Sequence, residues 1–431
     1  EDPRRQRQMC IRDRFRIMEL LTTNNVWMMV CTFLVFFMHL GFTFLEVGLT
    51  RQKNSINILF KNFFVITAGL IIYCAVGFNL MYPSEWLIEG ILGSPVAGLD
   101  AEAAADLSYN EGYTYWTDFL FQGMFAATAA TIISGAVAER IKISSFMLIA
   151  SLYVAIVYPI VGAWKWGGGF MDAAGFYDFA GSTLVHAVGG WGALVVIYFL
   201  GARKGRFGKD GAVIPGSNIP LSAAGVVILW LGWFGFNGGS VLSADPALTS
   251  VTLVNTCLAA AAGGLSCAGL YKVFYGKADI MMFMNGVLGG LVGITAGADL
   301  MLPTSSIIIG FISGPVVFLS SSLLEKAELD DPVGAIPVHL FCGIWGTLAV
   351  GIFGSLASFD QFMIQLACVG ITGVFCIVAG TIIVQLVKAV KGLRVTEEAE
   401  EAGLDISEHD GSLAYAQFQI TSKKYLSLIH I

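Results

Sequence analysis

Two histidines, His186 and His339, lie inside long apolar runs and have the chemistry needed to pass a proton. Each follows an aspartate by eight residues, in the segments DFAGSTLVH (from Asp178) and DPVGAIPVH (from Asp331). An ionisable side chain inside a bilayer is costly, so it indicates a substrate path or a proton relay. Two of them at equivalent points of an internal repeat predict one site at the repeat interface, near the midplane of a transporter or channel.

Imidazole suits this role because it changes charge near neutral pH. Apolar surroundings disfavour its charged form, so both rings are expected to be neutral. A neutral ring carries one donor and one acceptor nitrogen, and two adjacent rings could therefore form a short polar track. The alternative interpretation is a pair of packing histidines bonded to the backbone. A metal site is not expected, because no third His or Cys accompanies the pair in ligand spacing.

Aromatic side chains supply a second candidate site. Trp and Phe faces attract cations by roughly 0.5–2 kcal/mol, and a serine hydroxyl can accept a hydrogen bond from an N–H donor. An aromatic cage with one hydroxyl therefore suits ammonium or a small alkylammonium ion. The alternative interpretation places each aromatic against lipid or in an interfacial belt. The residues concerned are Phe121, Phe125, Trp166, Trp233, Phe234, Phe236 and Ser240.

The composition indicates a membrane protein. Of the 431 residues, 56% are hydrophobic and 13% are charged, whereas soluble chains carry roughly 25% charged residues. The mean hydropathy is +0.74. The net charge of −7 identifies no partner, because the charges cluster in loops and tail. Nucleic-acid binding is not expected, since no basic helix or aromatic–basic patch occurs. The eight cysteines include no CxxC pair and are interpreted as packing residues rather than disulfides.

Eleven apolar runs approach the length of about 20 residues that a spanning helix needs. Their connections alternate between basic and acidic segments, which places the N-terminus outside and the C-terminus inside. The pattern predicts an all-α polytopic membrane protein of two inverted five-helix repeats plus a final helix. In the first run, His39 is expected to be structural and Glu46 to reach the membrane interface. The runs cover residues 25–48, 60–82, 117–138, 145–165, 181–201, 220–239, 250–271, 281–300, 304–324, 335–357 and 364–387.

The two ends of the chain are expected to be non-native. Residues 9–14 are MCIRDR and residues 426–431 are LSLIHI, and one sequencing adapter, translated in its two directions, accounts for the first and most of the second. Excluding the start also removes six arginines that an outer N-terminus would not carry. The expected organisation is an extension at 1–17, a membrane domain at 18–387, a cytoplasmic regulatory tail at 388–425 and an adapter-derived end at 426–431.

Six separated motifs resemble those of the ammonium transporter (Amt/MEP) family, in the family's order, over about residues 20 to 420. They are GAVAER, WGGG, DFAGSTLVH, GWFGFNGGS, DDPVGAIPVH and the tail segment GLDISEH. Rhesus proteins look less similar, because the tail and DFAGSTLVH are of the Amt kind. The resemblance implies a homotrimer in the cell (inner or plasma) membrane, with one pore in each eleven-helix protomer. It implies neither a cofactor nor an enzymatic activity.

The resemblance also implies roles for individual residues. His186 and His339 would be the twin pore histidines, and Asp178 would be a buried electrostatic or structural acid below the outer site. Phe125 and Phe236 would form a stacked gate. The outer ammonium-binding site would consist of Phe121, Phe125, Trp166 and Ser240, with Trp233 adjacent to the pore.

These inferences predict a protein that recruits ammonium at the outer aromatic site, removes a proton and conducts ammonia past the histidines, with or without separate return of the proton. The expected partners are ammonium or ammonia, methylammonium, membrane lipid and a PII-type signal protein at the tail. Lys165, beside Trp166, is unusual for a site that attracts cations, because its own side chain is positively charged. Three other classes stay open: an ammonium sensor with little transport, a neutral ammonia or CO2 gas channel, and an intramembrane enzyme.

Overall fold

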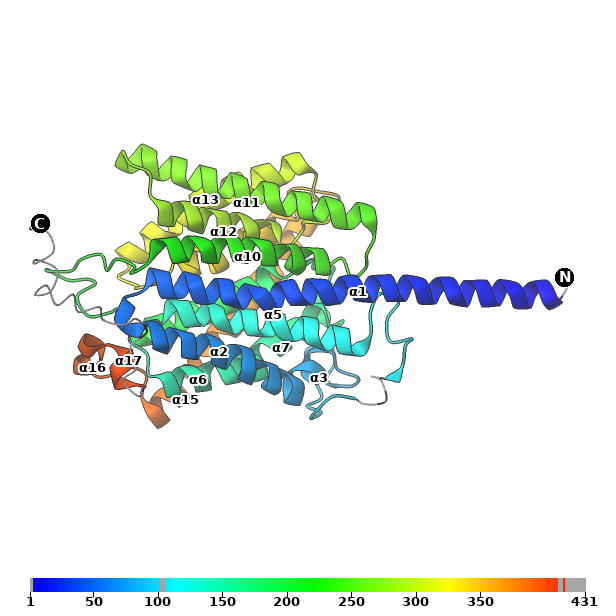
Figure 1. Cartoon of the computed structure of the whole chain (residues 1–431), viewed down its shortest axis with the longest axis horizontal. Helices are drawn as coiled ribbons and strands as arrows, with labels where there is room; N and C mark the ends of the chain where they lie inside the picture. Colours follow the sequence, from blue (N-terminus) through cyan, green and yellow to red (C-terminus); the bar gives the residue numbers. More distant parts are fainter. Residues whose placement is uncertain (1–2, 101, 103–104, 410–413, 415–431) are drawn as a thin grey trace, which may run out of the picture.

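The computed structural model describes residues 3–100, 102, 105–409 and 414. Long helices run side by side to form a bundle, with loops at both ends (Figure 1). Among the described residues, nine helices are long and apolar enough to span a membrane, and two shorter apolar helices cover Ile280–Ile294 and Ile336–Ala349. Each of these segments overlaps one of the eleven predicted runs. The number of crossings and the orientation of the termini stay predictions.

The described elements follow one another as a helical chain with a single two-stranded hairpin. They are α1 (Pro3–Leu49), η1 (Gln52–Asn54), α2 (Ser55–Ile72), η2 (Tyr73–Gly77), α3 (Phe78–Met81), β1 (Trp86–Ile88), β2 (Leu92–Gly93), α5 (Tyr115–Ala136), α6 (Ile143–Leu152), η3 (Tyr153–Val157), α7 (Tyr158–Lys165), α8 (Phe170–Ala173), η4 (Ser182–Ala187), α9 (Val188–Leu200), α10 (Ile219–Gly239), α11 (Pro246–Tyr275), α12 (Ile280–Ile294), α13 (Pro303–Lys326), η5 (Ile336–Phe341), α14 (Cys342–Ala349), α15 (Phe359–Lys391), α16 (Glu397–Ala402) and α17 (Leu404–Ser407).

Several helix boundaries differ from the predicted runs, for example at the end of α14 (Ala349 instead of residue 357), and two of the differences have a local explanation. α1 is continuous from Pro3, whereas the first run starts at residue 25, and Figure 1 shows the helix projecting beyond the bundle. No Gly or further Pro occurs between Pro3 and Gly41, so nothing in this stretch interrupts an existing helix. α12 ends at Ile294 instead of residue 300, because the carbonyls of Thr295 and Ala296 accept the N–H groups of Ala180 and Phe179.

α1 and α10, the first helices of the two predicted halves, form the most extensive helix pair. Their backbones come close at Gly225, where a Cβ atom would lie 2.6 Å from Leu45 N and 2.7 Å from Gly41 O. Small residues allow such contacts in lipid, where apolar burial does not drive helix association. η4 and η5, which lie in the last segment of each half, are also in contact. The two halves therefore meet along α1 and α10 and again at η4 and η5.

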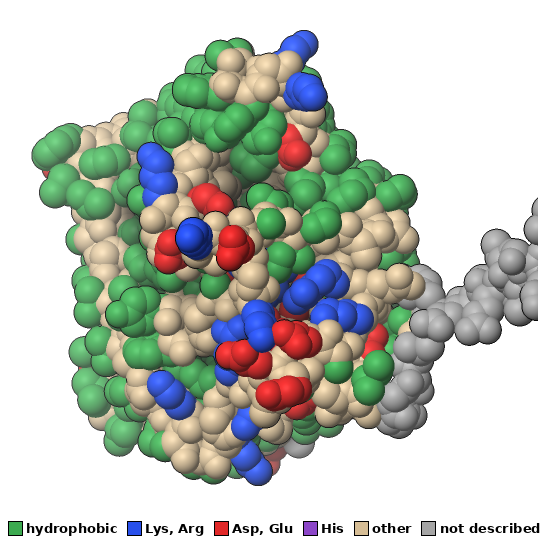
Figure 2. All heavy atoms as spheres, turned by 90° about the vertical axis from the view of Figure 1, so that its left-hand side faces the viewer, with side chains coloured by type: hydrophobic (Ala, Val, Ile, Leu, Met, Phe, Trp, Pro, Cys, Tyr) green, Lys and Arg blue, Asp and Glu red, His purple; other side chains and the backbone are tan. Residues whose placement is uncertain are grey.

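The end of the bundle that carries α16 and α17 is called the tail side here, and the opposite end, with β1 and β2, the hairpin side. Figure 2 shows Lys, Arg, Asp and Glu side chains gathered on the tail side. Arg203 donates to Asp330 at 2.8 and 3.0 Å and to Glu139 at 2.9 Å. Burial alone would raise the pKa of Asp330, but Arg203 and Arg140 hold it down at about 2. Asp330 therefore stays charged at neutral pH, and the network joins the segments after α5 and α9 to the loop before η5.

The substitution Gly225→Ala tests the close contact between α1 and α10. Overpacking of a tight contact costs about 1–3 kcal/mol, so purified protein in detergent is expected to unfold at a lower temperature than the wild type. The matched control is Gly269→Ala in α11, where a Cβ atom would have nothing within 4 Å. This variant is expected to unfold at or above the wild-type temperature, because Ala favours a helix more than Gly does. Equal unfolding temperatures of the two variants would contradict the close approach.

Candidate conduction pathway

His186 and His339, which are 153 residues apart in sequence, come together inside the bundle with their Nδ1 atoms 3.2 Å apart. The rings stack with centroids 5.2 Å apart and an interplanar angle of 24°, and both side chains are buried. One Nδ1 must donate and the other accept, so two neutral rings carry opposite tautomers. One Nε2 is then a donor and the other an acceptor. Within the described ranges, no cluster of three or more potential metal ligands forms.

The first of the two aspartates holds the start of its histidine-bearing segment. The Asp178 carboxylate accepts four backbone N–H groups at 2.8–2.9 Å, from Gly181 and Ser182 on Oδ1 and from Thr183 and Leu184 on Oδ2. These are the N–H groups that the beginning of a helix leaves without partners. η4 is a π-helical segment, and this capped start fixes where its histidine points.

The second aspartate repeats this arrangement with fewer bonds. Asp331 accepts the N–H of Gly334 at 3.1 Å and that of Ile336 at 2.7 Å, at the start of the π-helical segment η5. Gly334 has a φ of 77° and Gly181, its counterpart, a φ of 105°. Glycine adopts this left-handed region without the penalty that a Cβ brings. The repeated Asp and Gly therefore form a helix-start motif that positions each histidine.

Aromatic rings continue from the histidine pair toward the hairpin side. Phe125 and Phe236 stack at 4.0 Å with planes 13° apart, and Phe236 lies 5.2 Å from His186. Phe121 lies 4.6 Å and Trp166 6.3 Å from Phe125. We call this series of rings, together with the two histidines, the aromatic column. It brings together six of the predicted aromatic and histidine residues in the predicted order.

Trp166 and Ser240 lie at the edge of the column. The indole N–H of Trp166 donates to the main-chain oxygen of Asp178 at 3.0 Å. The Ser240 hydroxyl donates to Phe236 O at 2.9 Å, which leaves its lone pairs able to accept a hydrogen bond. The neighbouring Gly239 faces Phe121, because a Cβ atom there would lie 2.7 Å from the ring atom Cε2. Ser240 thus lies next to the column, because it bonds Phe236 and its neighbour Gly239 contacts Phe121.

Lys165 has an anionic partner. Its ammonium group forms an ion pair with Asp172 and lies 5.9 Å from the centre of the Tyr177 ring. The hydroxyl of Tyr177 in turn donates to Asp299. The positive charge beside Trp166 is therefore offset by acidic side chains on the hairpin side.

Trp233 lies where the resemblance places it, beside the histidines. It stacks on His186 at 5.0 Å and 19°, and its indole N–H donates to Thr295 Oγ1 at 2.9 Å. Phe234 is only partly buried and makes no ring contact with the column in the part of the chain that the structure describes. The hydroxyl groups of Thr183 and Thr347 form a further pair with their Oγ1 atoms 2.6 Å apart. No sequence motif predicts it, because the contact joins distant helices.

Phe42 and Glu46 of α1 lie beside the histidine pair, next to His339. Phe42 lies 6.2 Å from His339, between ring centroids, and Glu46 has an exposed fraction of 2%. The expectation that Glu46 reaches the membrane interface is therefore wrong, because the helix turns its carboxylate toward α2 and α5, where Asn62 and Ser134 bind it. Residues four apart lie on the same helix face. The spacing of Phe42 and Glu46 therefore could have predicted that Glu46 faces the bundle interior together with Phe42.

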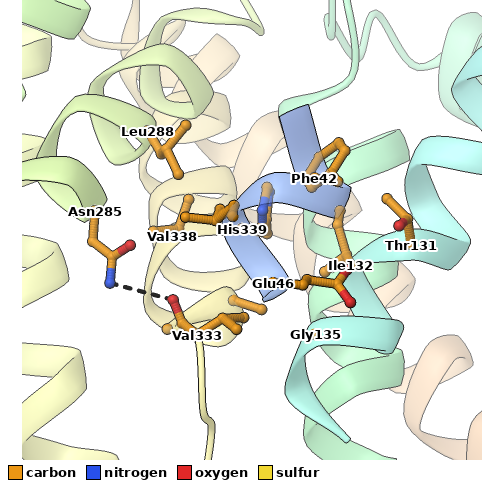
Figure 3. Close-up of a pocket in the computed structure, with 13 residues that line it drawn as sticks. Phe42, Glu46, Thr131, Ile132, Gly135, Asn285, Leu288, Val333, Val338 and His339 are labelled. Atoms are coloured by element: carbon orange, nitrogen blue, oxygen red, sulfur yellow. Dashed lines mark hydrogen bonds between the residues drawn. The ribbon is translucent and has the colours of Figure 1, made fainter. Parts of the chain in front are cut away.

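A small cavity of about 20 Å³ continues the pathway beyond His339. Figure 3 shows His339, Phe42 and Glu46 around this space. The volume suffices for one molecule of the size of water, which is also the size of ammonia. A wider pocket of about 700 Å³ on the tail side shares Asn285, Val333 and Gly334 with it as walls. Asn285 Nδ2 donates to Val333 O at 3.4 Å at this boundary.

The sequence matches the model of the Ammonium Transporter Family over residues 26–415. The chain belongs to the ammonium transporter family. It is 41% identical over 393 residues to a putative ammonium transporter of Synechocystis sp., covering 90% of this chain and 88% of that protein. It is 40% identical over 430 residues to the ammonium transporter Amt2 of Archaeoglobus fulgidus, covering 93% and 90%.

Solved structures of the family share the fold. A protein named Sensor Amt Protein aligns with a TM-score of 0.84 and 34% identity, over 90% of this chain and 98% of its own. Saccharomyces cerevisiae Mep2 aligns with a TM-score of 0.80 and 24% identity, over 91% and 93%. Family membership and the apolar helices establish an integral membrane protein of the ammonium transporters. The predicted family and helical fold class are confirmed, and the roles of the individual residues stay predictions.

The substitution Asp178→Asn tests the helix-start motif. An amide offers one acceptor oxygen in place of two, so about two of the four N–H groups lose their partner, and each buried unpaired donor costs about 1–3 kcal/mol. Purified protein in detergent is expected to unfold at a clearly lower temperature. The control Asp172→Asn removes a carboxylate that is 47% exposed, and surface ion pairs contribute only about 0–1 kcal/mol. If both variants unfold at the wild-type temperature, the carboxylate does not hold η4.

Proposed function

We propose that this protein transports ammonium across the cell (inner or plasma) membrane by binding NH4+ at the aromatic mouth, removing a proton and conducting NH3 past His186 and His339. The observation that carries the proposal is the direct contact of the Phe125–Phe236 stack with the buried histidine pair. Family membership supplies the substrate class, and the aromatic column supplies a reason for selectivity.

An intact cation would meet a large barrier in this column. Phe125, Phe236 and His186 are fully buried or nearly so, and a charge without compensating partners is costly in such surroundings. Potassium is nearly as large as ammonium but has no proton to give up. Ammonia is neutral, and it can both donate to and accept from imidazole nitrogens. A narrow apolar path therefore separates the two ions by their chemistry rather than by their size.

The hairpin side provides the recruitment site of this proposal. Trp166, Phe121 and Phe125 present aromatic faces, each of which attracts a cation by roughly 0.5–2 kcal/mol. Ser240 retains lone pairs for an N–H donor. Asp178 acts as an electrostatic and structural acid rather than as the base, because four N–H donors already occupy its carboxylate. Methylammonium, which shares the N–H donors, is a second substrate of the same site.

The fate of the proton decides whether transport carries charge. The two Nδ1 atoms share one proton between opposite tautomers, so a proton taken up by one ring can be released from the other. Return along this pair makes transport electrogenic, whereas release at the outer side makes it neutral, as in a gas channel for ammonia or CO2. Every part of the column lies within one chain, so each protomer of the proposed homotrimer in lipid would hold one complete pathway.

Ammonium sensing with little transport is the second candidate function, because one aligned structure is named a sensor Amt protein. A sensor needs the recruitment site but not a complete path. In this chain the histidine pair and the cavity beyond it continue the path toward the tail side, which favours conduction. An enzyme is not proposed, and the relatives with curated names are named ammonium transporters.

Purified protein in liposomes is expected to give a current in an ammonium gradient and none in a potassium gradient. His186→Ala and His339→Ala each leave one ring without its partner and open space for water. Each variant is therefore expected to lose ammonium current to the level of empty liposomes or to admit potassium. Solid-supported membrane electrophysiology measures both ions. Wild-type ammonium currents in both variants, with potassium still excluded, would contradict the proposed role of the pair.

The tail segment α16–α17 is proposed to regulate transport. Lys53, in the connection between α1 and α2, donates to Glu400 O at 2.8 Å and to Glu401 O at 2.6 Å. Asp405 accepts the N–H of Asn57 at 2.9 Å. The tail thereby holds the connection that follows Glu46 along the chain. A PII-type signal protein binding on the tail side would reach this segment, and such a partner is part of the proposal.

Truncation before Glu397 tests this regulatory role. Loss of the tail contacts frees the connection between α1 and α2, so the ammonium current is expected to fall while the protein still inserts into liposomes. A pull-down with a purified PII-type protein is expected to lose binding in the same variant. Unchanged current together with unchanged binding would favour a solvated tail without a regulatory role.

A further inference from the structure

Glu46 is a carboxylate in an otherwise apolar part of the pathway, and neither the histidine pair nor the outer site explains it. It lines the small cavity together with His339, and Figure 3 shows the two side chains approaching this space from α1 and η5. The cavity holds about one water-sized molecule, at about 20 Å³. Ammonia that leaves the histidines therefore enters a space that Glu46 borders.

Neutral donors hold this carboxyl group. Glu46 Oε2 accepts from Asn62 Nδ2 at 3.2 Å and from Ser134 Oγ at 2.8 Å, and Thr131 fixes Asn62 by donating to its Oδ1 at 3.1 Å. No hydrogen bond ends on Oε1 within the described residues. The group therefore has a fixed position and an oxygen left for another partner. Neutral donors of this kind do not lock the carboxyl group into one charge state.

Charged neighbours surround Glu46 at a greater distance. From α2, the buried Lys61 donates to Ser134 O at 2.7 Å, so its ammonium group stands behind the serine that bonds Glu46. Glu139 and Arg140, in the segment after α5, lie near Lys61, and the neutral ring of His339 in η5 lines the same cavity as Glu46. α10, which packs along α1, contains no titratable residue. Lys61 offsets the negative charge of the ionised carboxylate without forming a direct ion pair with it.

We propose that Glu46 is the proton donor that converts ammonia back to ammonium at the tail side of the pathway. The O–H bond of the carboxyl group breaks as a new N–H bond forms, so Glu46–COOH and NH3 become Glu46–COO⁻ and NH4+. A proton from His339 or from water on the tail side then restores the acid. The inference rests on the proposed conduction of ammonia and adds a group that ends the neutral part of the path.

The position of Glu46 makes this protonation step favour transport toward the tail side. Beyond the small cavity, the wider pocket shares Asn285, Val333 and Gly334 as walls, so Glu46 lies close to the boundary between the apolar path and solvent. An ammonium ion formed there meets the high cost of returning through the aromatic column. Protonation at this boundary therefore retains the substrate on the tail side.

The substitution Glu46→Gln tests the inference because the amide keeps the shape and can still accept from Ser134. The ammonium current in liposomes is expected to fall on the order of tenfold. This loss is smaller than the usual contribution of a positioned general acid, because water can donate the proton in place of Glu46. With pH set separately on the two sides, the wild-type current is expected to fall as the tail-side pH rises, since the acid loses its proton. The variant is expected to lose this dependence.

The matched control is Glu328→Gln, which changes an exposed acid of the same type in the loop after α13. It experiences the same imposed gradients and is expected to keep the wild-type current and pH profile. If Glu46→Gln does not accumulate as folded protein, Glu46→Asp replaces it in the test. Aspartate is shorter by one methylene and places its carboxylate farther from the cavity, so a lower current with a shifted pH profile is expected.

The outcomes separate this inference from the proposed function. A wild-type protein without ammonium current contradicts both. A conducting wild type with an equally conducting Glu46 variant of unchanged pH profile overturns the role of Glu46 and leaves ammonia conduction intact. A Glu46 variant that binds methylammonium like the wild type, but conducts less and without tail-side pH dependence, supports the proton donor and shows that the outer site is unaffected.

Discussion

The contact between the two imidazoles is the interaction on which the rest of the structure depends. Placing two polar rings in an apolar interior is unfavourable unless each satisfies the other, and a 3.2 Å separation of the Nδ1 atoms leaves little tolerance. Two segments from opposite halves of the chain must therefore meet at a set distance and angle. The capped starts of η4 and η5, and the close approach of α1 and α10, serve that requirement.

Much of this architecture can be predicted from local patterns. The apolar runs give the helices, because their length and composition alone decide membrane insertion. The spacing of Asp178 and His186, repeated at Asp331 and His339, indicates paired sites because an aspartate that caps a helix start fixes the residues of its first turns. The aromatic cage follows from residue types known to bind cations.

Other features escape prediction because they depend on how helices rotate against one another. Glu46 is buried on the face of α1 that Asn62 and Ser134 cover, and no periodicity in α1 alone reveals those partners. The early end of α12 depends on carbonyl groups captured by Phe179 and Ala180, which are more than a hundred residues earlier in the chain. A family resemblance transfers roles at matching positions, but it does not describe a side chain that its motifs leave out.

Asp178 serves two neighbours with different parts of the same residue. Its main-chain oxygen binds the Trp166 indole, while its carboxylate caps the segment that carries His186. Asp178 therefore connects the tryptophan to the segment that carries the imidazole, with hydrogen bonds on both sides. Any tilt of the indole must therefore either break that hydrogen bond or pull on η4, so in the proposed function an ion bound at the entrance would affect the position of His186.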